Sequence, residues 1–163
     1  MNEKLIYIVD DEEALRTLLG HWVTKKWGHS ARIFNDAESC LQYLDENPSL
    51  VLLDLMLPGM DGVEALKEIK RRVPALPVIM LSAQGKIDLA IDTLRLGATD
   101  YFSKPIDFPK LEAAVKNALH IYELEGEVQR LREQAVRRIQ FDDIVSGSGD
   151  MQEVFRLIEK VKE

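Results

Sequence analysis

Several charged or hydroxyl-bearing side chains come directly after short apolar runs of the sequence. Aspartates follow the runs at 5–9 and 50–53, a serine follows the run at 77–81, and a lysine comes just beyond a short run at 99–102. These residues are Asp10, Asp11, Asp54, Ser82 and Lys104. If the runs are parallel strands, their carboxyl ends meet at one edge of the sheet, where ligands bind in such folds. We therefore expect the five side chains to lie in one crevice.

The chemistry that such a group supports is phosphoryl transfer. Three neighbouring carboxylates repel one another, so either one of them takes up a proton or a cation joins them. A set of oxygen ligands with space for water suits Mg²⁺. A carboxylate can also attack a phosphoryl group and form an acyl phosphate, whose oxygens Mg²⁺, the Lys104 ammonium and the Ser82 hydroxyl would neutralise.

Each of these residues also has an ordinary structural interpretation. An aspartate after a strand often caps the next helix, and this is the more common role for a residue such as Asp11. A lysine before a proline, such as Lys104, is usually a surface residue. The functional interpretation rests on the whole set, because its members come from four separate places in the sequence and each stands at the end of a strand.

The elements that must position these residues alternate between strand and helix patterns. Apolar runs predict strands near 5–9, 31–34, 50–53, 77–81 and 99–102, with apolar residues at helical spacing between them. Asp36 is a predicted N-cap, and Gly97 closes the fourth helix. Five strands alternating with five helices indicate an α/β fold with a doubly wound parallel sheet. The least apolar run, at 31–34, is expected at an edge, which fits the flavodoxin-like strand order 2-1-3-4-5.

The composition is that of a soluble, acidic protein. The 163 residues are 46% hydrophobic and carry a formal net charge of −7, and the mean hydropathy is −0.14. No apolar run approaches the roughly 20 residues of a membrane span, and the run at 5–9 is too short for a signal peptide. The acidic balance argues against direct nucleic-acid binding. We expect a cytoplasmic protein whose single cysteine, Cys40, packs on the apolar face of a helix.

The last helix is predicted to begin near Pro109 and to continue past the end of the sheet domain. Around and beyond Tyr122, apolar residues recur at alternating spacings of three and four, with charged residues between them. They are Ile121, Leu124, Val128, Leu131 and Ala135. This short heptad pattern predicts a dimeric coiled coil, although one amphipathic helix lying on its own domain would give the same pattern. The chain therefore divides into a domain at 1–122, a linker helix at 123–140 and a further segment at 141–163.

Four motifs give the sequence a specific resemblance to a known family. They are the segments VDDE at 9–12, LDLMLPGMDG at 53–62, LSA at 81–83 and YFSKP at 101–105. In this order and spacing they resemble the receiver domains of bacterial two-component response regulators, over about residues 3–122.

The resemblance implies a role for each residue of the predicted crevice. Asp54 would accept a phosphoryl group from a partner, the cognate sensor histidine kinase. Mg²⁺ would be held by Asp10, Asp11, Asp54 and the main-chain carbonyl of Met56. Of the two neighbouring aspartates, Asp11 would contact the ion more directly than Asp10. The bond between Lys104 and the following proline is commonly cis in this family, which would aim the Lys104 side chain inward.

The resemblance also implies how a signal leaves the site. Ser82 and Tyr101 occupy the two switch positions, and Met56 and Gln84 occupy variable positions associated with the lifetime of the phosphoryl group. Phosphate on Asp54 would bond to the Ser82 hydroxyl, and Tyr101 would rotate into the space vacated. This change would bias a surface made of the fourth helix, the fifth strand and the fifth helix, from which the heptad helix continues. Phosphorylation would then either create or break a homodimer.

The segment after residue 140 has a resemblance of its own. Residues 142–148 and 151–158 are similar to the opening of the AAA+ ATPase domain of NtrC-like, sigma-54-dependent activators, with Ser146 where a glycine is usual. The phosphate-binding loop GxxxxGK[ST] does not occur in the sequence. We therefore expect a phosphoacceptor rather than an enzyme. The resemblance implies a regulatory piece, or a natural truncation, without the ATPase and DNA-binding domains of the full-length protein.

Two other functions fit part of the pattern. Phosphatases of the haloacid-dehalogenase type use a strand-end aspartate, Mg²⁺ and a lysine on a related fold. They require a second aspartate two residues after the first, where this chain has Met56. A receiver fold kept as an adaptor, without phosphate chemistry, would need none of the five residues, and all five are present. The phosphoacceptor is therefore the preferred interpretation.

Overall fold

The computed structural model of the chain describes residues 2–83 and 87–146. Its elements follow in strict alternation along the chain. They are β1 (Leu5–Val9), α1 (Glu13–His21), the π-helical turn η1 (Trp22–Lys26), β2 (Ser30–Phe34), α2 (Ala37–Gln42), the short 3₁₀ helix η2 (Leu44–Glu46), β3 (Leu50–Asp54), α3 (Gly62–Arg72), β4 (Val78–Ser82), α4 (Ile87–Arg95), β5 (Asp100–Ser103) and α5 (Phe108–Ser146). The predictions for Gln84 and for residues 151–158 concern residues outside the described ranges.

The five strands form one parallel sheet in the order β2-β1-β3-β4-β5. This confirms the predicted fold class and strand order, including the edge position of β2. The register pairs Val9 with Leu53, Asp54 with Leu81 and Ser82 with Ser103. The carboxyl ends of β1, β3, β4 and β5 therefore lie side by side at one edge of the sheet.

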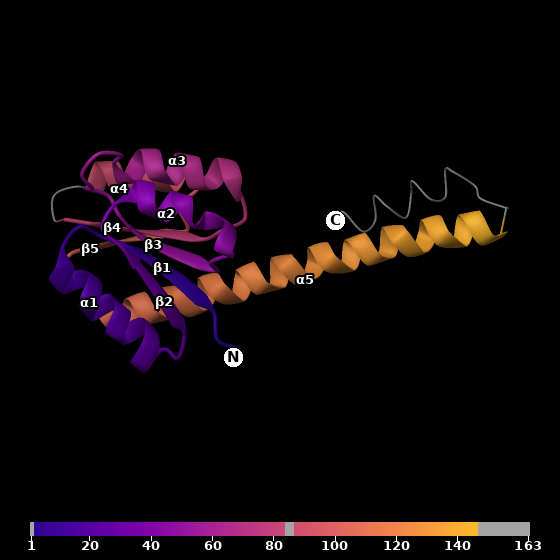
Figure 1. The fold of residues 1–163 in the computed structure, drawn as a ribbon, viewed down its shortest axis with the longest axis horizontal. Coiled ribbons are helices and arrows are strands. Elements are labelled where there is room, and N and C mark those ends of the chain that lie inside the picture. The colour runs from indigo at the N-terminus through magenta and orange to yellow at the C-terminus, as the bar shows by residue number, and fades with distance from the viewer. Residues whose placement is uncertain (1, 84–86, 147–163) are drawn as a thin grey trace. The chain divides into compact units, whose positions relative to one another are not determined.

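Two hydrophobic cores cover the two faces of the sheet. Successive residues of a strand point to opposite faces, and in β3 this places Val51 and Leu53 in one core and Leu50 and Leu52 in the other. The first core packs under α2 and α3 and includes Cys40, which is only 1% exposed. The second packs under α1 and the first turns of α5. Figure 1 shows α2, α3 and α4 on one side of the sheet and α1 with the start of α5 on the other.

Local sequence signals explain where several helices begin and end. Asp36 caps α2 as predicted, because its carboxylate accepts the Ser39 N–H at 2.7 Å. Asp61 caps α3 through the Glu64 N–H at 2.9 Å. The N-cap of α1 is Glu12 rather than Asp11. The structural alternative for Asp11, that it caps this helix, is therefore wrong.

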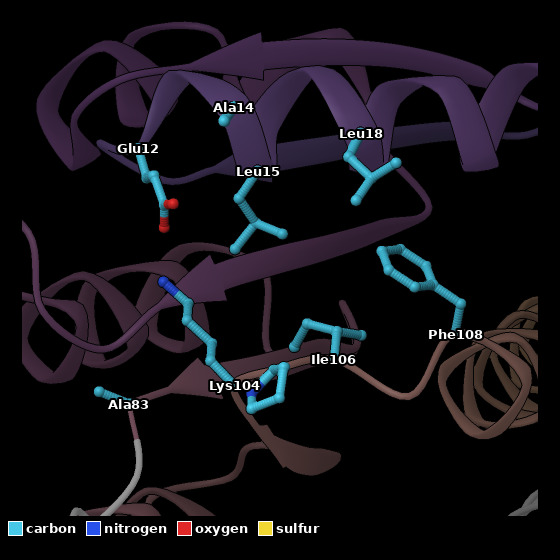
Figure 2. A pocket seen from close by; sticks show the side chains of 9 residues that line it. Glu12, Ala14, Leu15, Leu18, Ala83, Lys104, Ile106 and Phe108 are labelled. Atoms are coloured by element: carbon cyan, nitrogen blue, oxygen red, sulfur yellow. The ribbon is translucent and has the colours of Figure 1, made fainter.

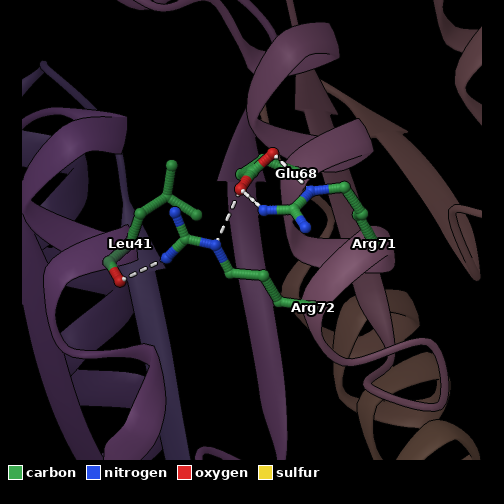
Figure 3. Close-up of polar contacts among 4 residues, drawn as sticks. All are labelled: Leu41, Glu68, Arg71 and Arg72. Atoms are coloured by element: carbon green, nitrogen blue, oxygen red, sulfur yellow. Dashed lines mark hydrogen bonds and ion pairs between the residues drawn. The ribbon is translucent and has the colours of Figure 1, made fainter.

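The helices α2 and α3 are joined at the end of the sheet domain away from the carboxyl ends of the strands. Arg72 donates from Nε to Glu68 at 2.7 Å and from Nη1 to the carbonyl oxygen of Leu41 at 3.2 Å (Figure 3). Arg71 donates to both oxygens of the same Glu68 carboxylate. Leu41 lies in the last turn of α2, where carbonyl groups have few N–H partners from the helix and can accept donors from outside it. Arg72 thus satisfies a helix end and fixes α2 against α3.

The chain divides into two compact units, residues 1–122 and 123–163. Within the second unit, the described part of α5 carries an apolar stripe on an otherwise charged helix. Leu124, Val128 and Leu131 are 51%, 44% and 50% exposed. Polar neighbours support the helix itself, through the ion pair of Arg130 with Glu127. None of the described helices is long and apolar enough to cross a membrane.

A close backbone approach fixes the chain between β3 and α3. The N–H of Gly62 donates to the carbonyl oxygen of Leu55 at 2.9 Å. A Cβ atom at position 62 would lie 2.4 Å from the carbonyl oxygen of Asp54 and 2.6 Å from the Cα of Leu55. Both contacts are with backbone, so they cannot be relieved by turning a side chain. Glycine is therefore required at position 62 for the chain after Asp54 to lie against the start of α3.

We predict that Gly62→Ala lowers the free energy of unfolding by about 1–3 kcal/mol, the usual cost of overpacking a tight site. The matched control is Gly126→Ala in α5, where nothing lies within 4 Å of the new Cβ. That change should be neutral or stabilise its helix by about 0.5–1 kcal/mol, because alanine has the higher helix propensity. Urea unfolding of the two variants and the wild type measures both effects. Equal stability of the two variants would show that the close approach at Gly62 is not a constraint.

Candidate functional site

The structure places the candidate site at the carboxyl ends of the central strands. Asp10 follows β1 directly, Asp54 is the last residue of β3 and Ser82 is the last residue of β4. Lys104 follows β5, and Asp11 follows Asp10. The parallel register sets these strand ends next to one another, so residues far apart in the sequence share one edge of the sheet.

Three carboxylates gather at this edge. Asp10, Asp11 and Asp54 each offer an oxygen atom, and these atoms all lie within 4.8 Å of one another. Asp10 is fully buried and Asp54 is 3% exposed, whereas Asp11 faces solvent. Three oxygen donors, one of them open to water, are the kind of ligand set that suits Mg²⁺.

Lys104 supplies positive charge to the two buried carboxylates. Its Nζ lies 3.0 Å from Oδ2 of Asp10 and 3.3 Å from Oδ2 of Asp54. The Lys104–Pro105 peptide bond is cis, as the sequence resemblance implied. Burial lowers the pKa of Lys104, but the hydrogen bond to Asp10 and the attraction of both carboxylates outweigh it and raise the pKa. The lysine therefore stays charged between its two partners.

Asp54 carries the most perturbed carboxyl group of the site. Burial and the neighbouring charge of Asp10 raise its pKa to about 6, against the lowering effects of Lys104 and of the Met56 N–H. The Met56 N–H donates to Oδ1 of Asp54 at 3.2 Å. Near neutral pH this group is therefore ionised at an energetic cost, which a further cation beside it would reduce.

Asp10 is held in place by groups of the chain that follows it. Its Oδ1 accepts the backbone N–H of Glu12 at 2.8 Å, and its carbonyl oxygen accepts Nη1 of Arg16 at 2.8 Å. Neither Arg16 nor Gly62 is predicted from the sequence to position the site, although Arg16 holds Asp10 and Gly62 lies against the strand end at Asp54. In the sequence, Arg16 is recognisable only as a residue one turn into α1, four positions after Glu12. Many surface residues have such a position, so it does not indicate a contact with Asp10.

The remaining predicted residues lie around this centre. Ser82 is buried, and its carbonyl oxygen accepts the Lys104 N–H at 2.6 Å. No hydrogen bond joins the Ser82 hydroxyl to Asp54 within the described part of the chain. Tyr101 lies in β5, half-buried against the core under α2 and α3. The Met56 side chain is 51% exposed and lines, with Asp11 and Leu89, a pocket of about 360 Å³ beside the carboxylates.

Comparisons with known proteins agree with this arrangement. Residues 6–116 match the family model of the response regulator receiver domain. The chain is 32% identical to the DNA-binding transcriptional regulator NtrC of Escherichia coli K12 over 162 residues, covering 97% of this chain and 33% of that protein. It is 31% identical to the regulatory protein AtoC of the same organism over 157 residues, covering 96% of this chain and 34% of that protein. The chain thus spans about a third of the length of these curated relatives.

Solved structures show the same likeness in three dimensions. The crystal structure of the receiver domain of NtrX from Brucella abortus is 38% identical, with a TM-score of 0.66, over 71% of this chain and 98% of that chain. A crystal structure of NtrX from the same organism in complex with ATP is 33% identical, with a TM-score of 0.74, over 86% of this chain and 35% of that chain. The family match, the strand order and the strand-end carboxylates lead to the same conclusion, that this chain belongs to the response regulator receiver domain family.

Proposed function

We propose that Asp54 is the phosphoacceptor of this receiver domain and takes its phosphoryl group from a sensor histidine kinase. The observation that carries the proposal is the environment of this single carboxylate. Asp54 is buried at the end of a central strand, 3.3 Å from the Lys104 ammonium and within reach of two further carboxylates. An ordinary structural aspartate needs neither the burial nor the like-charged neighbours, which together raise its pKa to about 6.

The donor atoms at the site fit a resident Mg²⁺ ion. Three carboxylates against one ammonium leave an excess of two negative charges, which one divalent cation balances. We propose that Asp10, Asp11 and Asp54 hold the ion, with the main-chain carbonyl of Met56 as a further ligand. When bound, Mg²⁺ would supply charge neutralisation for the phosphoryl oxygens.

Each residue of the site would have a separate role in the phosphoryl transfer. The Asp54 carboxylate attacks phosphorus, and the bond between phosphorus and the donor breaks as the bond to the Asp54 oxygen forms. Lys104 provides fixed positive charge where negative charge collects on the phosphoryl oxygens. The Ser82 hydroxyl then donates a hydrogen bond to the new phosphate. Tyr101, the second switch residue, rotates into the space that this movement vacates. Met56, exposed at the mouth of the site, would influence the access of hydrolytic water together with Gln84.

The alternative functions are weaker on the same residues. A phosphatase of the haloacid-dehalogenase type needs an acid two residues beyond the nucleophile, and Met56 presents a thioether there. A receiver kept as an adaptor would have no reason to retain three neighbouring carboxylates, because their mutual repulsion is costly even with Lys104 beside two of them. Phosphoacceptor chemistry uses all of these groups.

We further propose that residues 123–140 pair with a second copy as a coiled coil. The half-exposed apolar stripe of Leu124, Val128 and Leu131 supports this pairing. Residues 141–163 would open an AAA+ domain of a sigma-54-dependent activator, whose ATPase and DNA-binding domains act in the full-length protein. The receiver itself would act in the cytoplasm, without direct contact to nucleic acid or membrane, and its phosphorylation would make or break the dimer.

The first prediction concerns the phosphoacceptor. Acetyl phosphate with Mg²⁺ should add one phosphoryl group to the wild-type chain and none to Asp54→Ala, as read by intact-mass spectrometry. Asp92→Ala, which removes an exposed carboxylate of α4, is the matched control and should be modified like the wild type. Chelation of Mg²⁺ should abolish the modification. Phosphorylation of Asp54→Ala at the wild-type rate would assign the acceptor to another residue.

The second prediction concerns the charge of Asp54. Because its pKa is raised to about 6 in the folded protein, the stabilising protonated form is lost as the pH rises through 6. Asp54→Asn should therefore stabilise the metal-free protein at pH 7 by up to about 3 kcal/mol, and this advantage should disappear below about pH 4. Mg²⁺ should narrow the difference by stabilising the wild type more.

Urea unfolding in EDTA and in Mg²⁺, between about pH 4 and 8, measures both effects, with Asp92→Asn as the control. A wild type as stable as Asp54→Asn at pH 7 without metal would contradict the electrostatic account of the site. Equal stabilisation of the two proteins by Mg²⁺ would contradict the involvement of Asp54 in binding the ion.

The third prediction concerns the linker helix. Leu124→Gln with Leu131→Gln should weaken the dimer at least about tenfold, because each leucine loses about 1.5–3 kcal/mol of burial in the pair. Glu125→Gln with Glu133→Gln changes the charged side of the same helix and should leave the dimer largely intact. Light scattering at several concentrations gives the masses. Identical masses for the wild type and the leucine variant would place any dimer contact elsewhere.

A further inference from the structure

A second pocket opens beside Lys104, on the side of α1 (Figure 2). Its volume is about 540 Å³. Most of the wall is apolar and comes from α1 and from the segment between β4 and α5. The wall consists of Glu12, Ala14, Leu15, Leu18, Ala83, Lys104, Pro105, Ile106 and Phe108. Glu12 and Lys104 are the charged residues of this wall, and both lie at the same end.

The Glu12 carboxylate has no structural use that the described residues reveal. Glu12 occupies the N-cap of α1, but its side chain forms no capping hydrogen bond; its backbone N–H donates to Asp10, and its carbonyl oxygen accepts the Arg16 N–H. Among the described residues its carboxylate forms no ion pair. Figure 2 shows it extending from α1 toward the Lys104 ammonium across the end of the pocket. The Glu12 carboxylate therefore adds a further negative charge on the side of Lys104 that faces the pocket, while Lys104 itself contacts Asp54.

We propose that Glu12 sets the phosphodonor preference of this domain, favouring a donor that carries a protonated imidazole ring over an anionic acyl phosphate. The inference rests on the proposed role of Asp54 as acceptor and adds a specificity-determining residue to it. Glu12 is not a ligand of the phosphoryl group. It acts on the part of the donor that leaves, which lies on the side of phosphorus opposite the attacking oxygen of the buried Asp54 and therefore toward solvent, where Glu12 is exposed.

The chemistry of the two donor classes explains the preference. With a phosphorylated imidazole, the bond from phosphorus to nitrogen breaks while the bond from phosphorus to the Asp54 oxygen forms. The electron pair returns to the ring nitrogen, and a ring already protonated on its second nitrogen leaves as neutral imidazole. Until then the ring is cationic, and the Glu12 carboxylate attracts it. Acetyl phosphate instead carries only negative charge to the same opening and releases an acetate anion, which Glu12 repels.

The chain offers a matched control in the neighbouring residue. Glu13 is the first residue of α1, is exposed, and carries the same charge one position further along, but it does not line the pocket. Glu12→Gln and Glu13→Gln therefore change the net charge equally and differ only in whether the lost charge faces the pocket. Neither substitution removes the backbone N–H that holds Asp10, so the site geometry is preserved.

The experiment compares two small donors, acetyl phosphate and phosphoimidazole, on the full chain with Mg²⁺ at about pH 6.5, where an imidazole is partly protonated. The readout is the ratio of the phosphoimidazole rate constant to the acetyl phosphate rate constant, from intact-mass time courses. Glu12→Gln should lower this ratio about two- to fivefold, the effect of one partly exposed charge pair. Glu13→Gln should leave the ratio within experimental error of the wild type.

An unchanged ratio in Glu12→Gln, or an equal change in Glu13→Gln, would overturn the assignment of Glu12 while leaving Asp54 as the acceptor. If neither donor modified the wild type, the acceptor role itself would fail and the inference with it. A wild-type ratio in Glu12→Asp, together with a lowered ratio in Glu12→Gln, would show that the charge of the side chain matters rather than its size. This outcome would support the assignment.

Discussion

The crowding of two buried carboxylates, Asp10 and Asp54, is the constraint on which the rest of the structure depends. Their strands are neighbours in the sheet, with Val9 paired to Leu53, so the two groups cannot move apart without breaking the β1–β3 ladder. Lys104 compensates both at 3.0 and 3.3 Å, yet the pKa of Asp54 still rises to about 6. A buried charge that loses its partner is strongly destabilising. The fold therefore has to deliver a lysine to this point and hold it there.

Packing on both faces of the sheet provides the rigidity for this arrangement. Alternate residues of β3 enter two separate cores, and all four of the residues from Leu50 to Leu53 are fully buried. The N–H of Lys104 is bonded to the carbonyl oxygen of Ser82, so the lysine is fixed to β4 through its backbone as well as to the carboxylates through its side chain. Gly62 lets the chain after Asp54 fold back closely onto the strand end. Precise placement of the charges thus follows from the backbone as much as from the side chains.

The sequence predicted the parts of this structure that leave periodic or positional signals. Continuous apolar runs identified the buried strands, and the weaker run at 31–34 identified the edge strand β2. The rule that parallel strands end at one edge of the sheet is enough to predict from the sequence that Asp10, Asp54 and Lys104 lie together. Contacts that depend on exact geometry left no such signal. The bond from Arg16 to the Asp10 carbonyl, the close approach at Gly62 and the π-helical turn that follows α1 arise from backbone paths that residue types alone do not specify.

Lys104 also offers a physical route from the charge of Asp54 to β4 and β5. Its side chain contacts both buried carboxylates, and its backbone follows directly from β5, in which Tyr101 lies. A change in the charge at Asp54 therefore alters the balance of forces on a residue that is bonded to β4 and continuous with β5. Because close-packed cores resist gradual deformation, such a change is more readily absorbed by a shift between discrete arrangements of β5 and its neighbours than by small adjustments spread over the sheet. If Asp54 is the phosphoacceptor as proposed, the electrostatic conflict that makes it costly to ionise would also pass a change in its charge, through Lys104, to β4 and β5.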